Sequence, residues 1–244
     1  MPNIKAVIEY DGADFHGFQM QPNTRTVQQI LEKTLSGLLK VETRIVGAGR
    51  TDAGVHATRQ VISFRVDNGF PPENLCVALN GILPGDVKIK STEIADDYFN
   101  ARYSAKSRTY VYAILNRRQP SVYLSRYTWH VRQPLDIEMM KDAASRLIGS
   151  HDFSSFGTPD HLGCSTTRQL SCLSVWRRKD AVFLRIRANA FLRGMARAMT
   201  GVLVEVGQGK REASDVERII QSCNRQQSGV TAPPQGLYLT RVEY

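Results

Sequence analysis

The sequence predicts an α+β fold of two halves that each run strand, helix, strand, strand, helix, strand, the ferredoxin-like order. Short runs with period-two alternation indicate the strands, and apolar residues at helical spacing mark amphipathic helices between them. The same order recurs after a join near 95–107. We therefore expect two domains, 1–100 and 101–244, with antiparallel sheets joined edge to edge around a broad concave surface.

The first half begins with an alternating strand, a loop rich in aromatic and amide side chains at 15–23, and a well-marked helix. Thr26 is expected to cap this helix, with Gln29 as the other half of a capping box. Apolar residues keep the helical period through about residue 40. The predicted elements are a strand at 3–10, a helix at 26–40, strands at 43–48 and 57–66, a helix that begins at 71 and stops before 84, and a strand at 87–94.

The second half repeats the order with longer insertions. Its first strand alternates over 107–115, and Asp136 is placed to open the helix that follows. A hairpin is expected to turn at Lys179-Asp180. The predicted elements are a strand at 107–115, a helix at 136–148, strands at 168–178 and 181–190, helices at 192–206 and 214–223, and a strand at 236–244.

Composition bounds the class of protein. The chain has 244 residues, 42% of them hydrophobic and 23% charged, as in ordinary globular proteins. No run approaches the roughly 20 apolar residues of a membrane span, and the N-terminus lacks the apolar core of a signal peptide. The 4 cysteines are scattered without metal-ligand spacing, so we expect a cytoplasmic protein with reduced thiols and no zinc site.

Positive charge is concentrated in two blocks. The net charge is +9, and no acidic residue occurs in 98–135 or in 181–204. Such blocks indicate a polyanionic partner such as a nucleic acid, although a solvated basic face is an equally open interpretation. The basic residues of the two blocks are Arg102, Lys106, Arg108, Arg117, Arg118, Arg126, Arg132, Arg185, Arg187, Arg193 and Arg197. Arginine outnumbers lysine here, which favours bidentate phosphate contacts.

The stretch 47–57, Gly-Ala-Gly-Arg-Thr-Asp-Ala-Gly-Val-His-Ala, is the strongest candidate for chemistry. Its glycines and alanines let another molecule approach the backbone closely, and Asp52 has no bulky neighbour to shield it. Glycine and aspartate also gather in plain turns, so this stretch alone leaves a structural turn open.

Several segments in chain order resemble the tRNA pseudouridine synthase A family. The stretch 49–57 looks like that family's catalytic motif without a change. Further similar segments are Tyr10-Asp11-Gly12 with Phe15, Gly17, Gln19 and Gln21, Thr26-Val27-Gln28, Asn80 with Leu83-Pro84, 104–108 through Tyr110, His151-Asp152-Phe153, 189–192 with Met195 and Arg197, and 232–237. One motif could arise by chance, but an ordered set from the first strand to the last is hard to explain otherwise.

The resemblance implies a pseudouridine-synthase-type fold with a basic RNA-binding cleft between the two halves. It implies an enzyme that isomerises uridine to pseudouridine at positions 38 to 40 of the tRNA anticodon stem-loop by base flipping, without cofactor or metal. It also implies a homodimer that shares the tRNA between subunits. The basic residues expected to bind RNA are Arg102, Lys106, Arg108, Arg117, Arg118, Arg126 and Arg193.

The site roles are carried over residue by residue. Asp52 matches the essential aspartate, and Arg197 matches the arginine that keeps the carboxylate charged. Arg50 matches a residue thought to fill the space that the flipped base leaves. Tyr110 matches the tyrosine that stacks on the target uracil, and Leu237 matches a residue lining the uracil pocket. His56, His151 and Asp152 are expected to have structural roles.

Three departures from the family pattern put the exact uridines in question: Phe18 in place of tryptophan, Asn100 in place of histidine, and Arg193-Gly194-Met195-Ala196-Arg197 at the start of a helix. Three other functions stay open at this point. They are a non-catalytic tRNA-binding or folding protein, an aspartate-dependent nucleoside glycosidase and a pseudouridine synthase of altered site specificity. The glycosidase would need a second carboxylate that the motif does not offer.

Overall fold

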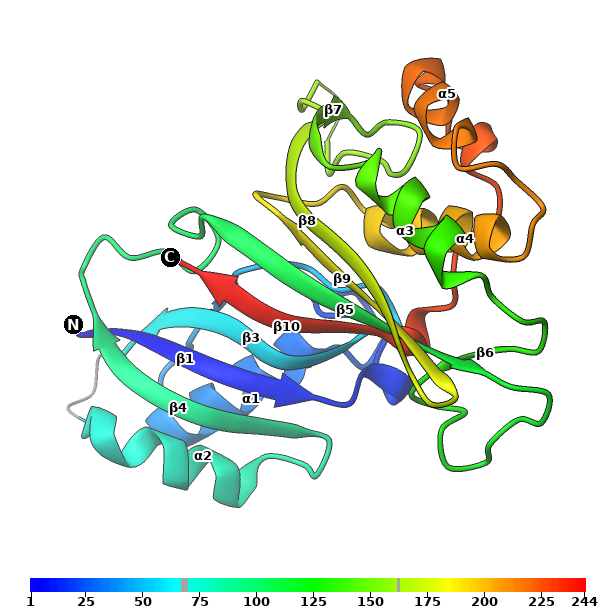
Figure 1. Cartoon of the computed structure of the whole chain (residues 1–244). Helices are drawn as coiled ribbons and strands as arrows, with labels where there is room; N and C mark the ends of the chain where they lie inside the picture. Colours follow the sequence, from blue (N-terminus) through cyan, green and yellow to red (C-terminus); the bar gives the residue numbers. More distant parts are fainter. Residues whose placement is uncertain (67–69, 162) are drawn as a thin grey trace. The chain divides into compact units, whose positions relative to one another are not determined.

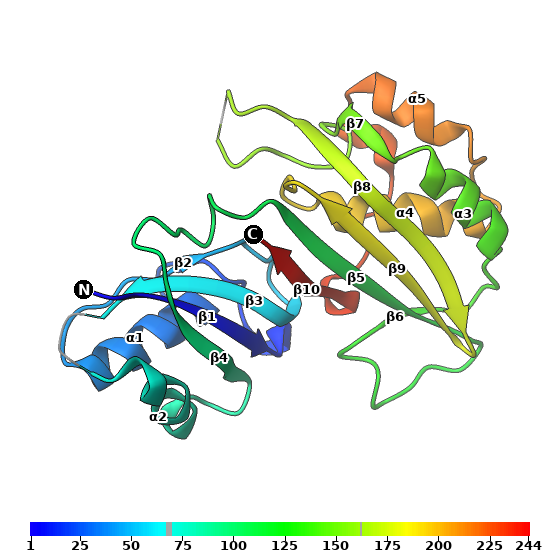
Figure 2. The same ribbon diagram turned by 60° about the vertical axis from the view of Figure 1, so that its left-hand side comes forward.

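The computed structural model describes residues 1–66, 70–161 and 163–244, and it divides into two compact units. Unit 1 comprises residues 1–106 and 239–244, and unit 2 comprises residues 107–238 (Figures 1 and 2). Both units contain helices and strands, so the α+β prediction is confirmed. None of the helices in the described part of the chain combines the length and apolar composition needed to cross a membrane.

Unit 1 is a sheet with two helices that lie side by side (Figure 1). Its strands are β1 (Asn3–Tyr10), β2 (Val46–Gly47), β3 (His56–Arg65), β4 (Val87–Ala95) and the C-terminal β10 (Leu237–Glu243), whose first two residues belong to unit 2. The order is β4-β1-β3-β10, with β2 on β3, and β1 is antiparallel to both neighbours. The helices are α1 (Val27–Leu39) and α2 (Leu75–Ile82), with 3-10 turns at Gly12–Asp14 and Pro72–Asn74.

Alternation along β1 explains the core of unit 1. Ile4, Ala6 and Ile8 are fully buried, whereas Lys5 and Glu9 on the other face form ion pairs with Glu93 and Lys90 on β4. The predicted cap of α1 is confirmed, because the Thr26 hydroxyl accepts a hydrogen bond from the backbone N–H of Gln29.

The predicted strand at 43–48 is wrong in extent, because only Val46–Gly47 pairs with β3. Side chains of α1 take the backbone groups that a longer strand would have used. The Ser36 hydroxyl accepts from the N–H of Thr43, and the buried Glu32 carboxylate accepts from the N–H of Ile45. The segment is therefore tied to the helix instead of the sheet.

Unit 2 contains strands covered by α3 and α4, which pack on each other (Figures 1 and 2). Its strands are β5 (Ser107–Asn116), β6 (Trp129–Val131), β7 (Gly149–Asp152), β8 (Thr167–Arg178) and β9 (Ala181–Ala188). The order is β5-β9-β8-β7 with antiparallel pairs, and β6 pairs in parallel with β5. The helices are α3 (Ile137–Ser145), α4 (Met195–Gly207) and α5 (Asp215–Ser222), and 3-10 turns follow at Arg225–Ser228 and Pro234–Gly236.

Two helix predictions in unit 2 are corrected. The helix at 136–148 ends at Ser145, and Gly149 with φ 128° starts a strand, β7, that we did not predict. The helix at 192–206 begins only at Met195, because Gly194 with φ 79° breaks the helical conformation before it. Strand β6 was also missed.

Candidate active site

Asp52 lies in unit 1, in the connection between β2 and β3, and is half-buried. The backbone N–H of Val55 donates to the carbonyl of Asp52 at 3.1 Å, and Gly54 has φ 77°. This is the geometry of a β-turn that requires glycine at its third position. The structural turn that the sequence left open is therefore present, and Asp52 occupies its first position.

The aromatic loop after β1 clamps this turn. The N–H of Phe18 donates to the carbonyl of Thr51 at 3.0 Å, and the N–H of Gly54 donates to the carbonyl of Phe15 at 3.2 Å. A Cβ atom on Gly12 would lie 2.0 Å from the carbonyl oxygen of Val55. Only glycine permits so close an approach, so these two segments form one packed structure.

Buried polar side chains fix the turn from below. The Tyr10 and Thr51 hydroxyls are 2.8 Å apart and share a hydrogen bond. His56 is buried, and its Nδ1 accepts from the N–H of Gly12 at 3.0 Å, which supports the expected structural role. Gln60, fully buried on β3, donates from Nε2 to the carbonyl of Gly49 at 2.8 Å.

Gln60 was not singled out from the sequence. The signal that could have found it is an amide side chain at the start of the apolar run 60–64, where a buried polar group needs a partner. Arg50, which was predicted, is exposed two residues before Asp52 in the same connection.

Unit 2 holds the other three predicted site residues. Tyr110 lies on β5, is buried to 6% exposure and contacts the ring of Phe191 edge-on at a centroid distance of 4.9 Å. Arg197 lies in the first turn of α4, where its Nε donates to the carbonyl of Ala232 at 2.8 Å, and the N–H of Ala232 donates back to the carbonyl of Arg197 at 3.1 Å. The guanidinium therefore has a fixed position beside the segment 232–237.

Tyr112 holds the same segment further along. Its hydroxyl donates to the carbonyl of Pro233 at 2.7 Å, and its ring leaves no room for a Cβ atom on Gly236. Burial raises the pKa of Tyr112 well above its ordinary value, so the phenol stays a hydrogen-bond donor. Leu237, buried to 5% exposure, follows this anchored turn. Arg197 and Leu237 are thus brought to the two ends of one short segment, and Tyr112 was not predicted to support it.

The basic residues predicted to bind RNA have different surroundings. Arg118, Arg126 and Arg193 are exposed in unit 2, as is Lys106 in unit 1. Arg117 bonds the carbonyls of Gln119 and Pro120 and lies 3.6 Å from Asp180. The guanidinium of Arg108 donates to the carbonyl of Asn189, and that of Arg102 lies 5.7 Å from the ring centroid of Tyr103.

Asp152 is the last residue of β7, and its carboxylate accepts a hydrogen bond from the backbone N–H of Ser154. Burial alone would raise the pKa of Asp152, but hydrogen bonds from the backbone N–H of Ser154 and from the Thr166 side chain outweigh it and hold the pKa below its ordinary value. The carboxylate thus braces the turn after β7. Among the residues that the structure describes, no three histidine, cysteine or acidic side chains group as a metal site would require.

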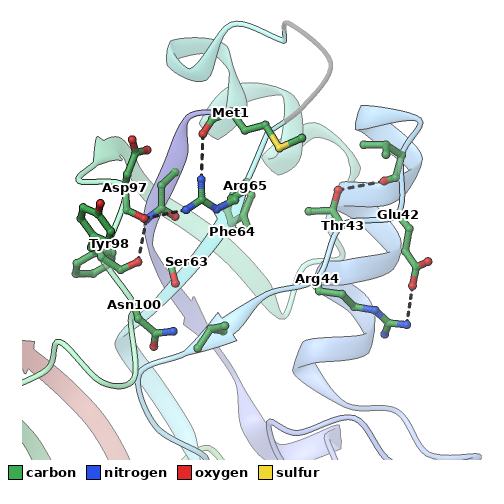
Figure 3. A pocket seen from close by; sticks show the side chains of 14 residues that line it. Met1, Glu42, Thr43, Arg44, Ser63, Phe64, Arg65, Asp97, Tyr98 and Asn100 are labelled. Atoms are coloured by element: carbon green, nitrogen blue, oxygen red, sulfur yellow. Dashed lines mark hydrogen bonds and ion pairs between the residues drawn. The ribbon is translucent and has the colours of Figure 1, made fainter.

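A cavity of about 510 Å³ lies in unit 1 at the end of β3 far from the Asp52 turn (Figure 3). Arg65 lines it and donates to the carbonyls of Met1 and Asp97, and Arg44 pairs there with Glu42. Ser63, Phe64 and Arg65 at the far end of β3 line the cavity, whereas the Asp52 turn precedes His56 at the start of that strand. None of the predicted site residues lines it, so we assign it no part in the chemistry.

Comparison with known proteins gives the chain its place. A family model described as tRNA pseudouridine synthase matches residues 6–104 and 143–244. The chain is 43% identical over 244 residues to tRNA pseudouridine synthase A of Thermoanaerobacter sp. (strain X514), with 100% of both chains covered. It is 42% identical over 244 residues to tRNA pseudouridine synthase A of Acetivibrio thermocellus, again with 100% of both chains covered.

Among solved structures, an archaeal box H/ACA sRNP Nop10–Cbf5 complex is similar with a TM-score of 0.37 and 9% identity, over 82% of this chain and 44% of that chain. An overlap this low carries no argument. The full-length sequence matches do, and they confirm the resemblance seen in the motifs: the chain belongs to the tRNA pseudouridine synthase A family, a family of isomerases.

Proposed function

We propose that the protein isomerises uridine to pseudouridine at positions 38, 39 and/or 40 of the tRNA anticodon stem-loop. The observation that carries the proposal is the similarity to tRNA pseudouridine synthase A along the whole chain, with the motif around Asp52 intact. The C1′–N1 bond of the uridine breaks, the uracil turns, and C5 bonds to C1′. The C5 proton leaves and N1 gains one, so the reaction needs neither oxidant nor cofactor.

In this proposal Asp52 is the catalytic carboxylate. Its half-buried position at the corner of a clamped turn supports the role, because a fixed charge next to the reacting sugar and base loses no energy to reorganisation. Attack at C1′, attack at C6 and abstraction of a sugar proton all use the ionised form. Arg50 fills the place of the flipped base, and its exposure leaves the side chain room to swing.

The proposed site residues of unit 2 contact the target uracil or act on Asp52. Tyr110 stacks on the target uracil and is the candidate acceptor of the C5 proton, and its fixed ring beside Phe191 supports this. Leu237 lines the uracil pocket. Arg197 keeps Asp52 ionised, in line with a guanidinium whose Nε is held by the carbonyl of Ala232.

The finer fold predictions stay predictions: two ferredoxin-like halves at 1–100 and 101–244, joined around a basic RNA-binding cleft. We likewise propose a cytoplasmic homodimer with tRNA as its partner. The RNA surface would include the predicted basic residues, among which Arg118, Arg126, Arg193 and Lys106 are exposed.

A synthase of altered site specificity remains the second candidate. Two departures from the family pattern have structural roles here. Phe18 is buried and its ring lies where a Cβ atom on Gly47 would be, and the side chain of Asn100 accepts from the N–H groups of Arg102 and Tyr103. Both lie in segments that shape unit 1, so a change of target uridine through loop geometry is a specific alternative.

The test uses unmodified tRNA with tritium at uracil C5 and uridines at positions 38, 39 and 40. We expect tritium release, and its loss from tRNAs with cytidine at the target positions identifies which uridines react. Release that persists in all these cytidine variants would favour altered specificity. Tight binding without release from any tRNA would favour a non-catalytic RNA-binding protein.

A further inference from the structure

The loop between β5 and β6, residues 117–128, exposes large apolar side chains that the core does not use. Val122 and Tyr123 are each 89% exposed, and Leu124 is 40% exposed. Figures 1 and 2 show the loop extending beyond the end of β5. Exposing such apolar side chains to water at a loop tip is unfavourable, and exposed apolar patches often mark a binding site.

The 117–128 loop has a defined conformation. The Ser125 hydroxyl donates to the carbonyl of Val122 at 2.8 Å, and the carbonyl of Leu124 accepts from the N–H of Tyr127 and the hydroxyl of Thr128, both at 2.9 Å. The N–H of Leu124 donates to the Ser121 hydroxyl at 3.3 Å. These bonds within the loop hold its backbone while its apolar tip points outward, which lowers the entropy lost on binding.

The loop is also anchored next to predicted site residues of unit 2. The hydroxyl of Tyr238 donates to the carbonyl of Tyr127 at 2.7 Å, and Tyr238 directly follows Leu237. At the end of the loop, the ring of Trp129 contacts the ring of Tyr112 at 6.2 Å, and Tyr112 holds the segment before Leu237. The loop tip therefore extends from the structure that positions Leu237.

Charge identifies the kind of partner. Arg117, Arg118 and Arg126 lie in the loop, which falls in the acid-free block 98–135. A second copy of this loop would meet like charge, whereas a polyanion with flat apolar faces complements both the arginines and the tip. Unpaired nucleotides have these properties, since bases stack on aromatic side chains while guanidinium groups bind phosphates.

We propose that the 117–128 loop binds unpaired nucleotides of the tRNA beside the target uridine, with Tyr123 stacking on a base and Arg118 and Arg126 contacting phosphates. The inference rests on the proposed function and names a part of the substrate-binding surface. Stacking of one base is worth enough for Tyr123→Ala to weaken tRNA binding by roughly tenfold.

Tyr98 provides a matched control. It is a tyrosine of 94% exposure in unit 1, and its neighbours Asp96 and Asp97 make that site unsuited to a polyanion. The experiment measures the dissociation constant for tRNA at several salt concentrations, with tritium release and thermal unfolding on the same preparations. Exposed tyrosines contribute little to folding, so both variants should unfold like wild type.

Tyr123→Ala should weaken binding by roughly tenfold without changing the salt dependence, because the ring neutralises no phosphate. Arg118→Gln should instead reduce the slope of log K against log salt by about 0.7 to 0.9. Tyr98→Ala should bind like wild type.

Equal affinities for Tyr123→Ala and Tyr98→Ala would overturn the inference. The inference would also be overturned if wild type were a dimer and Tyr123→Ala a monomer, because the loop tip would then be a contact between two copies of the chain. A wild-type protein that binds tRNA but releases no tritium would defeat the proposed function, while the binding comparison would still decide the role of the loop.

Discussion

Asp52 depends on neighbours that are themselves chemically inert. Gly54 supplies the positive φ of the turn, and the Thr51 hydroxyl and carbonyl are bonded by Tyr10 and Phe18. The motif could be found from the sequence because its glycines and aspartate are adjacent in the chain. For Gln60 the sequence offers only an amide at the start of an apolar run, because its bond to the carbonyl of Gly49 depends on strand register and burial, which a single sequence does not disclose.

Tyr112 makes a residue-scale prediction about alkaline stability. Its pKa is raised in the folded protein by burial, so the unfolded chain loses this proton near pH 10 while the folded protein keeps it. The free energy of unfolding should therefore fall as the pH rises above about 10. Tyr112→Phe should lose this contribution and, at pH 7, cost about 1 kcal/mol for the hydrogen bond to Pro233.

Urea unfolding of wild type and Tyr112→Phe between pH 8 and about 11 measures the effect. Tyr123→Phe is the control, since it removes the hydroxyl of a tyrosine that is 89% exposed. If Tyr112→Phe keeps the full alkaline loss of stability, the phenol is not protected as described.

At the scale of elements, the sequence predicts those elements whose signals are local. Helix α1 followed from its cap at Thr26 and its apolar period, and the structure confirms both. Strands β6 and β7 have only 3 and 4 residues, too few for a pattern to emerge. Strand β2 is shorter than predicted because the carboxylate of Glu32, on α1, accepts a hydrogen bond from the N–H of Ile45.

The clamp on the Asp52 turn makes a prediction through glycine. In Gly12→Ala the new methyl group would meet the Val55 carbonyl at 2.0 Å, so the aromatic loop and the Asp52 turn must separate. Misplacing a catalytic group by about 1 Å typically costs about 100-fold, and we expect a loss of kcat/KM of that order. Tritium release measures this loss.

Gly81→Ala in α2 is the matched control, because no atom lies within 4 Å of its added methyl group. It should keep full activity and gain about 0.5 kcal/mol or more of stability as a helical alanine. Wild-type activity in Gly12→Ala would show that the clamp does not position Asp52.

At the scale of the whole molecule, the family could be recognised because its motifs occur in order along the chain. The arrangement of the two units and the oligomeric state depend on contacts far apart in the sequence or between chains, and no local pattern encodes them. The dimer therefore rests on the resemblance alone.

The dimer prediction is tested by light scattering coupled to size-exclusion chromatography at micromolar concentration without tRNA. We expect a mass twice the 27.4 kDa of the chain. A C2 interface is built from the same patch on both copies. If that patch is largely apolar, the dimer should persist across the range of salt concentrations used for tRNA binding. A monomer at these concentrations would contradict the prediction.

The central claim is that the Asp52 carboxylate carries out the isomerisation, and single-turnover tritium release tests it most directly. Wild type, Asp52→Ala and Asp52→Asn are compared on one 5-tritiated tRNA, with tRNA affinity measured in parallel, and Glu73→Ala controls for the loss of one exposed negative charge elsewhere in unit 1. Both Asp52 variants should release no tritium yet bind tRNA as tightly as wild type, since phosphate contacts made elsewhere supply the affinity. Tritium release by Asp52→Ala at the wild-type rate, or a parallel loss of binding and release, would contradict the account.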